Sequence, residues 1–154
     1  MICAPADPAC AQAQALIAEL DAALAAICGA SGAGSFDPAD VGGAGSVFVV
    51  ARDGAGVAVG CGALRPLAAG VAELKRMYAR PGSGAGRLLL AALEEQAMAF
   101  GYREVWLSTR RVNQRALAFY GRHGYLRVAN YGRYVGSEAS VCLGKGLADD
   151  SCIP

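Results

Sequence analysis

The sequence predicts a single α/β domain with a mixed central sheet of about six to seven strands flanked by helices. Apolar residues recur with the period of a strand in some segments and of a helix in others. Their order is helix, three strands, helix, strand, helix, two strands. The 154 residues are 55% apolar, which is enough to bury a core but leaves no room for a second domain of ordinary size.

The N-terminal segment predicts one helix and one loop. Residues 7–28 form the helix, with Asp7 as its N-cap, Pro8 at its first position and a stripe of apolar residues at spacings of three to four. Residues 29–45 are rich in Gly, Ala and Ser and contain the pair Asp37-Pro38, so we expect a loop with at most one short helical turn.

Three antiparallel strands are expected next. Residues 46–52 and 57–64 flank Asp53-Gly54-Ala55-Gly56, which is typical of a β-hairpin. Residues 71–79 alternate charged and apolar side chains, as a third strand in the same sheet requires.

The second half of the chain alternates helices and strands. Residues 84–100 carry an apolar face at helical spacing, so the strand over 104–109 follows a helical crossover and runs parallel to strand 71–79. The remaining elements are a helix over 113–123 that ends at Gly124 and strands over 125–131 and 139–147.

The charge distribution favours a small anionic ligand. The net charge is +1, but residues 71–135 hold eleven basic and four acidic side chains, whereas residues 1–70 hold two basic and six acidic ones. The basic residues do not form a run interleaved with aromatics, and the pI is 7.6, which argues against nucleic acid as a partner. A nucleotide-bearing cofactor fits better.

The number and spacing of the cysteine and histidine residues indicate no metal site. The six cysteines are scattered without a CxxC pair, and His123 is the only histidine, so no familiar zinc spacing is present and we expect reduced thiols. Glu19 and Asp21 interrupt the most apolar stretch, and no basic residue precedes Arg52. We therefore expect neither a membrane span nor a secretory signal, and a cytoplasmic protein.

Residues 81–87, Pro-Gly-Ser-Gly-Ala-Gly-Arg, lie between a strand and a helix start. Glycines let the backbone approach a ligand and a helix N-terminus presents free N–H groups, so the segment predicts a phosphate site. A purely structural turn is the alternative. A Walker loop would need Lys and then Ser or Thr where Arg87-Leu88 stands, and a Rossmann fingerprint would need Gly or Ala at position 87. Neither motif fits.

The helix over 113–123 places an amide, a small residue and a phenol on one face. Asn113, Ala116 and Tyr120 follow one another at spacings of three and four. The alternative for Tyr120 is a half-buried core residue. His123 is expected to cap the C-terminal end of this helix, where a cation favours the helix dipole.

Together these segments resemble the GNAT N-acetyltransferase superfamily. The resemblance covers residues 46–147 and rests on the run from Glu73 to Pro81, the Gly-x-Gly-x-Gly loop, Leu107-x-Thr109, and the string Asn-x-x-Ala-x-x-Phe-Tyr-x-x-x-Gly-Tyr. The ending Tyr131-Gly132-x-Tyr134, followed by Ser140 to Leu143, resembles a small bacterial branch.

The resemblance implies a GNAT-like fold and one N-acetyltransferase domain over residues 1–154. Its parts are residues 1–45, with the N-terminal helix and an acceptor-side loop, residues 46–147, the cofactor-binding core, and residues 148–154, a tail. The implied reaction transfers an acetyl group from acetyl-CoA, without a metal, to a primary amine of a small molecule or peptide. The amine attacks directly within a ternary complex.

The resemblance also implies individual roles. In the family, the strand before the loop parts from its parallel neighbour and its backbone pairs with the pantetheine arm. The cofactor-binding residues are then Met77, Tyr78 and Ala79 at the pantetheine arm, Gly82, Ser83, Gly84, Ala85, Gly86 and Arg87 at the pyrophosphate, and Asn113 near the thioester. Tyr120 would also contact the cofactor and, as a catalytic residue, protonate the departing CoA thiolate.

Glu73 is the second candidate catalytic residue. It stands where the histone-acetylating branch of the family carries its general base, which implies that it accepts a proton from the amine directly or through water. Two alternatives are a solvated carboxylate and a structural partner for Arg65 or Lys75.

The loop departs from the family pattern, because Pro81 stands where the family usually carries Arg or Gln and the loop is a few residues shorter. Arg80 or Arg87 is expected to supply the missing charge. The short loop keeps a rival open, namely a CoA-binding or regulatory module with this fold and little or no turnover. A third hypothesis is a thiol hydrolase that pairs a cysteine with His123. A homodimer is left open.

Overall fold

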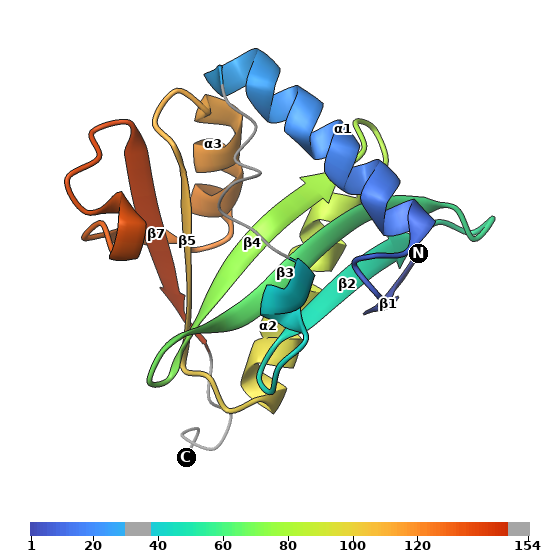
Figure 1. Ribbon diagram of the computed structural model, residues 1–154, viewed down its shortest axis with the longest axis horizontal. Helices are drawn as coiled ribbons and strands as arrows, with labels where there is room; N and C mark the ends of the chain where they lie inside the picture. The colour runs from blue at the N-terminus through green and yellow to red at the C-terminus, as the bar shows by residue number, and fades with distance from the viewer. Residues whose placement is uncertain (30–37, 148–154) are drawn as a thin grey trace.

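The computed structural model describes residues 1–29 and 38–147, and within them a seven-stranded sheet carries helices on both faces (Figure 1). The tail 148–154, Cys152 and part of the segment 29–45 lie outside the described residues. The strand order is β1-β2-β3-β4-β5-β7-β6, in which β4 and β5 are parallel and all other neighbours are antiparallel. The predicted α/β class with a mixed sheet is confirmed.

The strands are β1 (Ile2–Pro5), β2 (Val47–Arg52), β3 (Ala58–Ala68), β4 (Val71–Ala79), β5 (Glu104–Arg110), β6 (Leu126–Val128) and β7 (Ser140–Gly146). The α-helices are α1 (Ala11–Cys28), α2 (Ala85–Ala99) and α3 (Gln114–Arg122), and two short 3-10 turns are η2 (Pro38–Val41) and η3 (Gly132–Tyr134).

The N-terminal segment differs from the prediction in two ways. β1 was not predicted, because its four residues show no alternation and gain their order only by pairing with the edge of β2. The first helix begins at Ala11 with Cys10 as N-cap, so the expectation that Asp7 caps it was wrong. Asp7 instead forms a turn before the helix, where its side chain accepts a hydrogen bond from the Ala9 amide at 2.9 Å.

Two strands also differ in extent. β3 continues to Ala68, beyond the predicted end at residue 64. β6 covers only Leu126–Val128, whereas the prediction was a strand over 125–131. The chain leaves the sheet at both ends of β6, because Tyr125 is buried in the core and the Tyr131 side chain turns to contact Glu73.

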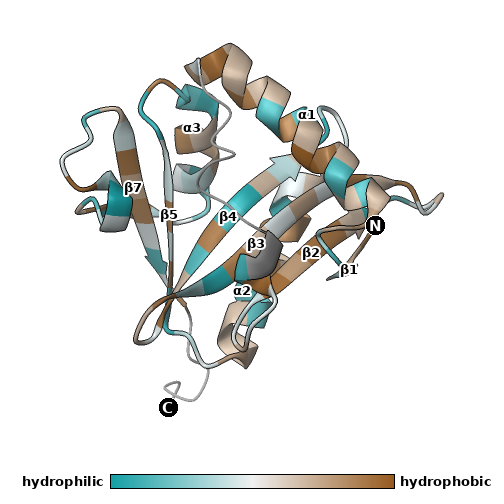
Figure 2. Cartoon of the chain, in the orientation of Figure 1, coloured by the Kyte–Doolittle hydropathy of each residue, from teal (hydrophilic) through white to brown (hydrophobic). Residues whose placement is uncertain are grey.

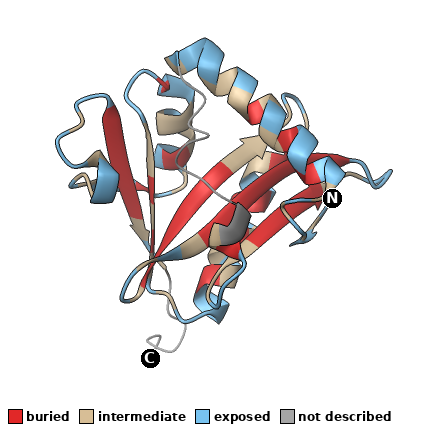
Figure 3. Ribbon diagram, in the orientation of Figure 1, coloured by how far each residue is buried: buried red, intermediate tan, exposed pale blue. Residues whose placement is uncertain are grey.

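The core has two parts, one on each face of the sheet. The larger part joins the sheet to α2 and α3, and the smaller part joins β2 and β3 to α1 (Figure 3). By length and composition α1 is able to cross a membrane, a test that core helices also pass. Here it packs through Ala13, Leu16 and Leu20, and its Asp21 and Glu19 form ion pairs with Arg76 of β4 and with Arg80 just after β4. In this structure α1 is a layer of the domain.

A β-bulge in β4 changes the face that its side chains occupy. Between the pairs Cys61↔Tyr78 and Ala63↔Lys75, β4 has the two residues Arg76 and Met77, whereas β3 has only Gly62. Arg76 adopts a φ of 54°. The residues of β4 that join the core under α2 are Ala72, Leu74, Met77 and Ala79. Lys75 and Arg76 are therefore neighbours that both point to the α1 face. Figure 2 shows hydrophilic residues along this largely buried strand.

β4 and β5 separate after a short paired stretch. They pair only from Val71↔Glu104 to Glu73↔Trp106. Beyond that point β5 continues along β7 as far as Arg110, and β4 continues along β3 as far as Ala79. Figure 1 shows the two strands diverging toward α3. This separation agrees with what the sequence resemblance implied, and it opens the sheet from one face to the other.

Candidate active site

A cavity of about 570 Å³ lies where β4 and β5 separate. Its size is typical of a small-molecule site. The residues that line it are Leu20, Leu24 and Cys28 of α1, Glu73 to Met77 of β4, Leu107 to Arg110 of β5, Asn113, Ala116 and Tyr120 at α3, and Arg133, Tyr134, Ser137 and Ser140.

The cavity unites four of the predicted site residues and leaves out the others. Glu73, Met77, Asn113 and Tyr120 line it. Tyr78, Ala79 and the loop 82–87 lie beyond its wall, and the Tyr78 hydroxyl points to α1, where it donates to Glu19 at 3.0 Å. The Tyr78 side chain therefore braces α1.

Tyr120 reaches the cavity from the α3 face of the sheet. Its ring is 8% exposed and packs edge-on against Phe119 and Tyr125, with ring centroids 5.2 and 5.6 Å away. Burial raises the pKa of its phenol, so the hydroxyl keeps its proton at neutral pH. No described residue accepts a hydrogen bond from it. Tyr120 therefore offers an unused proton donor to whatever occupies the cavity.

Asn113 has a structural role that the sequence analysis did not include. Its side-chain oxygen accepts a hydrogen bond from the Ala116 amide at 3.2 Å, so Asn113 is the N-cap of α3. The residue is 8% exposed, and among the described residues nothing accepts from its Nδ2 amide group. The cap fixes the direction of this donor at the cavity wall.

The glycine-rich loop leads into α2 as predicted. Gly84 is the N-cap of α2 with a φ of 72°, and Ser83 accepts a hydrogen bond from the Ala85 amide at 3.2 Å. The first amides of a helix have no partner within the helix, so this end presents N–H groups outward. A Cβ at Gly86 would lie 3.4 Å from the Phe119 ring of α3, which is ordinary van der Waals contact, so packing alone does not require glycine at this position.

Two arginines flank the loop, and they differ in whether the side chain has an ion-pair partner. Arg80 donates to both carboxylate oxygens of Glu19, with distances of 2.8 to 3.2 Å, and so fastens the end of β4 to α1. Arg87 is exposed and forms no hydrogen bond or ion pair with a described residue. Of the two arginines expected to supply charge for a phosphate, Arg87 is the one without another partner in the described structure.

Glu73 lies at the centre of a cluster on the α1 face, which we call the Glu73 cluster: Glu73, Arg65, Lys75, Tyr131 and Tyr134. The Glu73 carboxylate is 2% exposed. It accepts hydrogen bonds from Arg65 Nε at 2.9 Å and the Tyr131 hydroxyl at 2.7 Å, and Lys75 Nζ lies 3.9 Å away. Both carboxylate oxygens therefore already hold donors, and the predicted partnership with Arg65 and Lys75 is present.

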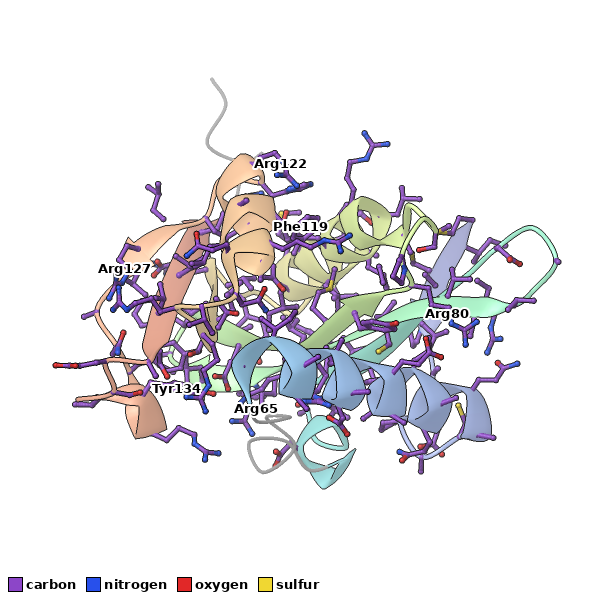
Figure 4. All side chains as sticks on the ribbon, turned by 90° about the horizontal axis from the view of Figure 1, so that it is seen from above. Arg65, Arg80, Phe119, Arg122, Arg127 and Tyr134 are labelled. Atoms are coloured by element: carbon purple, nitrogen blue, oxygen red, sulfur yellow. The ribbon has the colours of Figure 1, made fainter. Side chains whose placement is uncertain are left out.

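The two tyrosines of this cluster come from the chain after β6. Burial, and then the Glu73 charge, raise the pKa of Tyr131. Tyr134 accepts a hydrogen bond from Lys75 Nζ at 3.2 Å, and its ring lies under the same ammonium. Figure 4 shows Tyr134 and Arg65 well away from Arg80 along α1. The sequence analysis quoted Tyr131 and Tyr134 as a family signature but assigned them no role.

Within residues 1–29 and 38–147, the structure shows no contact between His123 and a cysteine. His123 lies at the C-terminal end of α3 as predicted, with Nδ1 3.0 Å from the Phe119 carbonyl oxygen and its ring against Phe119. It is outside the cavity wall, whereas Cys28 lines it. Burial raises the pKa of the Cys61 thiol to about 12. The five described cysteines are all free thiols, and the described residues contain no cluster of three potential metal ligands.

The fold and the site together define an α/β protein with a small-molecule cavity between two parted parallel strands. The Tyr120 hydroxyl lies on the wall of this cavity, and the N-terminal end of α2, which suits a phosphate, lies beyond that wall. The comparison with known proteins agrees, because the sequence pattern of the Acetyltransferase (GNAT) family matches residues 14–125. The chain belongs to this family and is an acyltransferase.

Individual relatives support the same family. An "IAA acetyltransferase" of Azospirillum brasilense is 34% identical over 104 residues, which are 65% of this chain and 67% of that protein. A structure from Klebsiella pneumoniae, assigned as an acyl-CoA N-acyltransferase, is 31% identical to this chain. The match covers 96% of this chain and 97% of the Klebsiella chain, with a TM-score of 0.79. A GNAT acetyltransferase from Elizabethkingia anophelis with acetyl-CoA bound is 16% identical, with a TM-score of 0.57 over 67% of this chain and 77% of its own.

Proposed function

We propose that the protein transfers the acetyl group of acetyl-CoA to a primary amine of a small molecule or peptide, by direct attack of the amine within a ternary complex. The observation that carries this proposal is the Tyr120 hydroxyl, which reaches the cavity between β4 and β5 without an acceptor among the described residues. Family membership supplies the reaction class.

The residues around the point where β4 and β5 separate suit acetyl-CoA as the ligand. The free edge of β4 beyond Glu73 offers backbone groups to the amides of the pantetheine arm, and the N-terminal end of α2 with Arg87 offers donors and charge to the pyrophosphate. The Elizabethkingia structure with the same fold holds acetyl-CoA, which supports this choice of donor. Asn113, held by its capping bond, would donate near the thioester.

Tyr120 is the proposed general acid. When the amine nitrogen bonds to the acetyl carbon, the carbon–sulfur bond breaks and the electron pair stays on the CoA sulfur. The phenol gives its proton to the thiolate, and the proton that the nitrogen loses as the amide forms returns to the phenolate, so CoA leaves as its thiol and Tyr120 is restored. A phenol with a raised pKa is protonated at neutral pH and is available for this transfer in every turnover. The ammonium form of the acceptor must lose a proton before it attacks.

Glu73 is proposed to orient the acceptor rather than to serve as the base. Arg65 and Tyr131 each donate one hydrogen bond to a different oxygen of Glu73, which holds the carboxylate in place and leaves a second lone pair on each oxygen for an ammonium donor. On this view the small neutral fraction of the amine is the nucleophile.

The direct test is incubation with acetyl-CoA and a panel of amines, amino acids and peptides. Release of the CoA thiol is followed together with the mass of the acetylated product. Amine-dependent release with a matching product supports the proposal. Thiol release without any amine, abolished by alkylation, would indicate the thiol hydrolase instead. Stabilisation by CoA with no product from any amine would indicate the binding module that lacks turnover.

A further inference from the structure

The α1 side of the cavity is strongly cationic. Four basic side chains line the cavity, Lys75, Arg76, Arg110 and Arg133, against one acidic side chain, Glu73. The bulge in β4 is one cause, because it turns Lys75 and Arg76 to the same face of the sheet. Alternation along β5 is another, since Val105 and Leu107 join the core under α2 and Arg110 therefore points to the α1 face.

Neighbouring acidic groups remove only part of this charge. Asp21 of α1 pairs with Arg76, and Asp40 pairs with Arg65 at 2.7 Å. Glu73 accepts from Arg65 Nε and lies 3.9 Å from Lys75 Nζ, so Arg65 and Lys75 together offset Glu73 and Asp40. Among the described residues, five positive charges, on Arg65, Lys75, Arg76, Arg110 and Arg133, then stand against three negative charges, on Glu73, Asp21 and Asp40, so the wall keeps an excess of two positive charges.

Arg110 is the cation of this wall that the fold itself does not use. It lies at the end of β5, its side chain is exposed, and it makes no hydrogen bond or ion pair with a described residue. A guanidinium in this state matches a carboxylate or a phosphate through two parallel hydrogen bonds. Leu20 and Leu24 of α1 add an apolar surface to the same cavity.

We propose that the acceptor is a small amine that also carries an anionic group, as an amino acid does, and that Arg110 binds this anion. The inference rests on the proposed acetyl transfer and specifies its acceptor. The positive wall attracts such a molecule and holds its amine between Glu73 and Tyr120. It repels amines that carry several positive charges, such as polyamines, because like charges face each other across a site of low dielectric.

The test compares amines that differ only in the anionic group. Leucine and leucinamide share the amine and the side chain, but only leucine is anionic at its other end, and phosphoethanolamine replaces the carboxylate by a phosphate. We expect kcat/KM for leucine to exceed that for leucinamide by about tenfold or more, the size of one charge-assisted contact. The amide is the more reactive amine in solution because its amine is less basic, so this preference has to come from the protein.

Arg110→Gln provides the residue-level test, with Arg127→Gln as the matched control. Arg127 is an exposed arginine on β6 outside the cavity wall (Figure 4). Arg110→Gln should raise the KM for leucine about tenfold, leave kcat within a few-fold and remove the preference over leucinamide. Arg127→Gln should change none of these values. Activity with phosphoethanolamine in place of leucine would identify phosphate as the anion that Arg110 binds.

Two results would overturn this inference. Higher kcat/KM with leucinamide or a polyamine would show that the acceptor is not anionic, while acetyl transfer itself stands. An equal loss with every amine in Arg110→Gln would show a general structural role. If no amine is acetylated, the proposed acetyl transfer is wrong. Separate calorimetric titrations of leucine and of leucinamide into the protein with CoA present then still decide whether the cavity prefers the anionic ligand.

Discussion

The molecule contains two clusters of nearly the same composition in different surroundings. In the Glu73 cluster a buried carboxylate accepts from a tyrosine and an arginine, and a lysine lies over a second tyrosine ring. In the second, which we call the Glu94 cluster, Glu94 accepts from the Tyr125 hydroxyl at 2.9 Å and from Lys145 Nζ at 3.0 Å, and this lysine lies over the Tyr125 ring.

The two clusters differ in what they face. Glu73, Lys75 and Tyr134 line the cavity, whereas no member of the Glu94 cluster does. Local chemistry alone therefore does not distinguish a site from a structural contact. The difference lies in the split between β4 and β5, which exposes one cluster to a ligand. The predictions below use the Glu94 cluster and other residues outside the cavity as controls.

The largest effect is expected from Tyr120→Phe. This change keeps the ring packing and removes the proton donor at the cavity, so kcat should fall about 100-fold or more while the Kd for acetyl-CoA stays within a few-fold. Steady-state rates and equilibrium binding measure the two quantities. Tyr125→Phe is the control, since its hydroxyl contacts Glu94 outside the cavity, and it should lower stability with little change in kcat. A Tyr120→Phe enzyme with normal turnover and weakened binding would contradict the assignment.

The next effect concerns the loop and its free arginine. Acetyl-CoA at about 100 times its Kd should stabilise the fold by about 2.7 kcal/mol. Arg87→Glu places a negative charge beside the expected pyrophosphate, and a tenfold weaker Kd would reduce this stabilisation to about 1.4 kcal/mol. Thermal unfolding with and without ligand gives both values. Arg127→Glu should retain the full stabilisation, and no ligand-induced shift in the native protein would exclude the site.

Glu73→Gln and Glu94→Gln separate stability from function. Each change removes a charge that holds a lysine and a tyrosine, so each should lower the free energy of unfolding by about 1–3 kcal/mol. Only Glu73→Gln should raise the KM of the acceptor, and the shape of its pH–rate profile should stay that of the native enzyme. Loss of the acidic limb of that profile in Glu73→Gln would instead show that Glu73 is the base.

The smallest effect is expected from the exposed pair at the other end of α1. The hydrogen bond from Arg80 lowers the pKa of Glu19 from its usual value of 4.5. A lowered folded-state pKa gives stability above pH 4.5, which is lost as the pH falls through the folded pKa. Glu19→Gln should therefore cause a slight loss of stability at pH 7, in the range of a surface ion pair, and this loss should shrink as the pH falls below 4.5. Glu95→Gln, at an exposed carboxylate on α2, is the control for the removal of one negative charge.

The sequence by itself determined the elements whose signals are local. Helical spacing of apolar residues located α2, and Asp53 to Gly56 located the hairpin between β2 and β3. The string from Asn113 to Tyr125 placed Asn113, Ala116 and Tyr120 on one face of α3 and ended the helix at Gly124, because residues three and four apart on a helix share a face. These predictions needed no knowledge of the rest of the chain.

Only the tertiary structure decided the arrangement of charges. Glu73 meets Tyr131, a residue 58 positions away, and the bulge at Arg76 shifts the alternation of β4 that a regular strand would keep. β1 exists only because β2 offers it an edge. Pairing across a sheet and ion pairing between distant segments depend on distances in space, which a period along the sequence does not contain. Whether a carboxylate faces a ligand or only supports the fold is therefore decided by where β4 and β5 part.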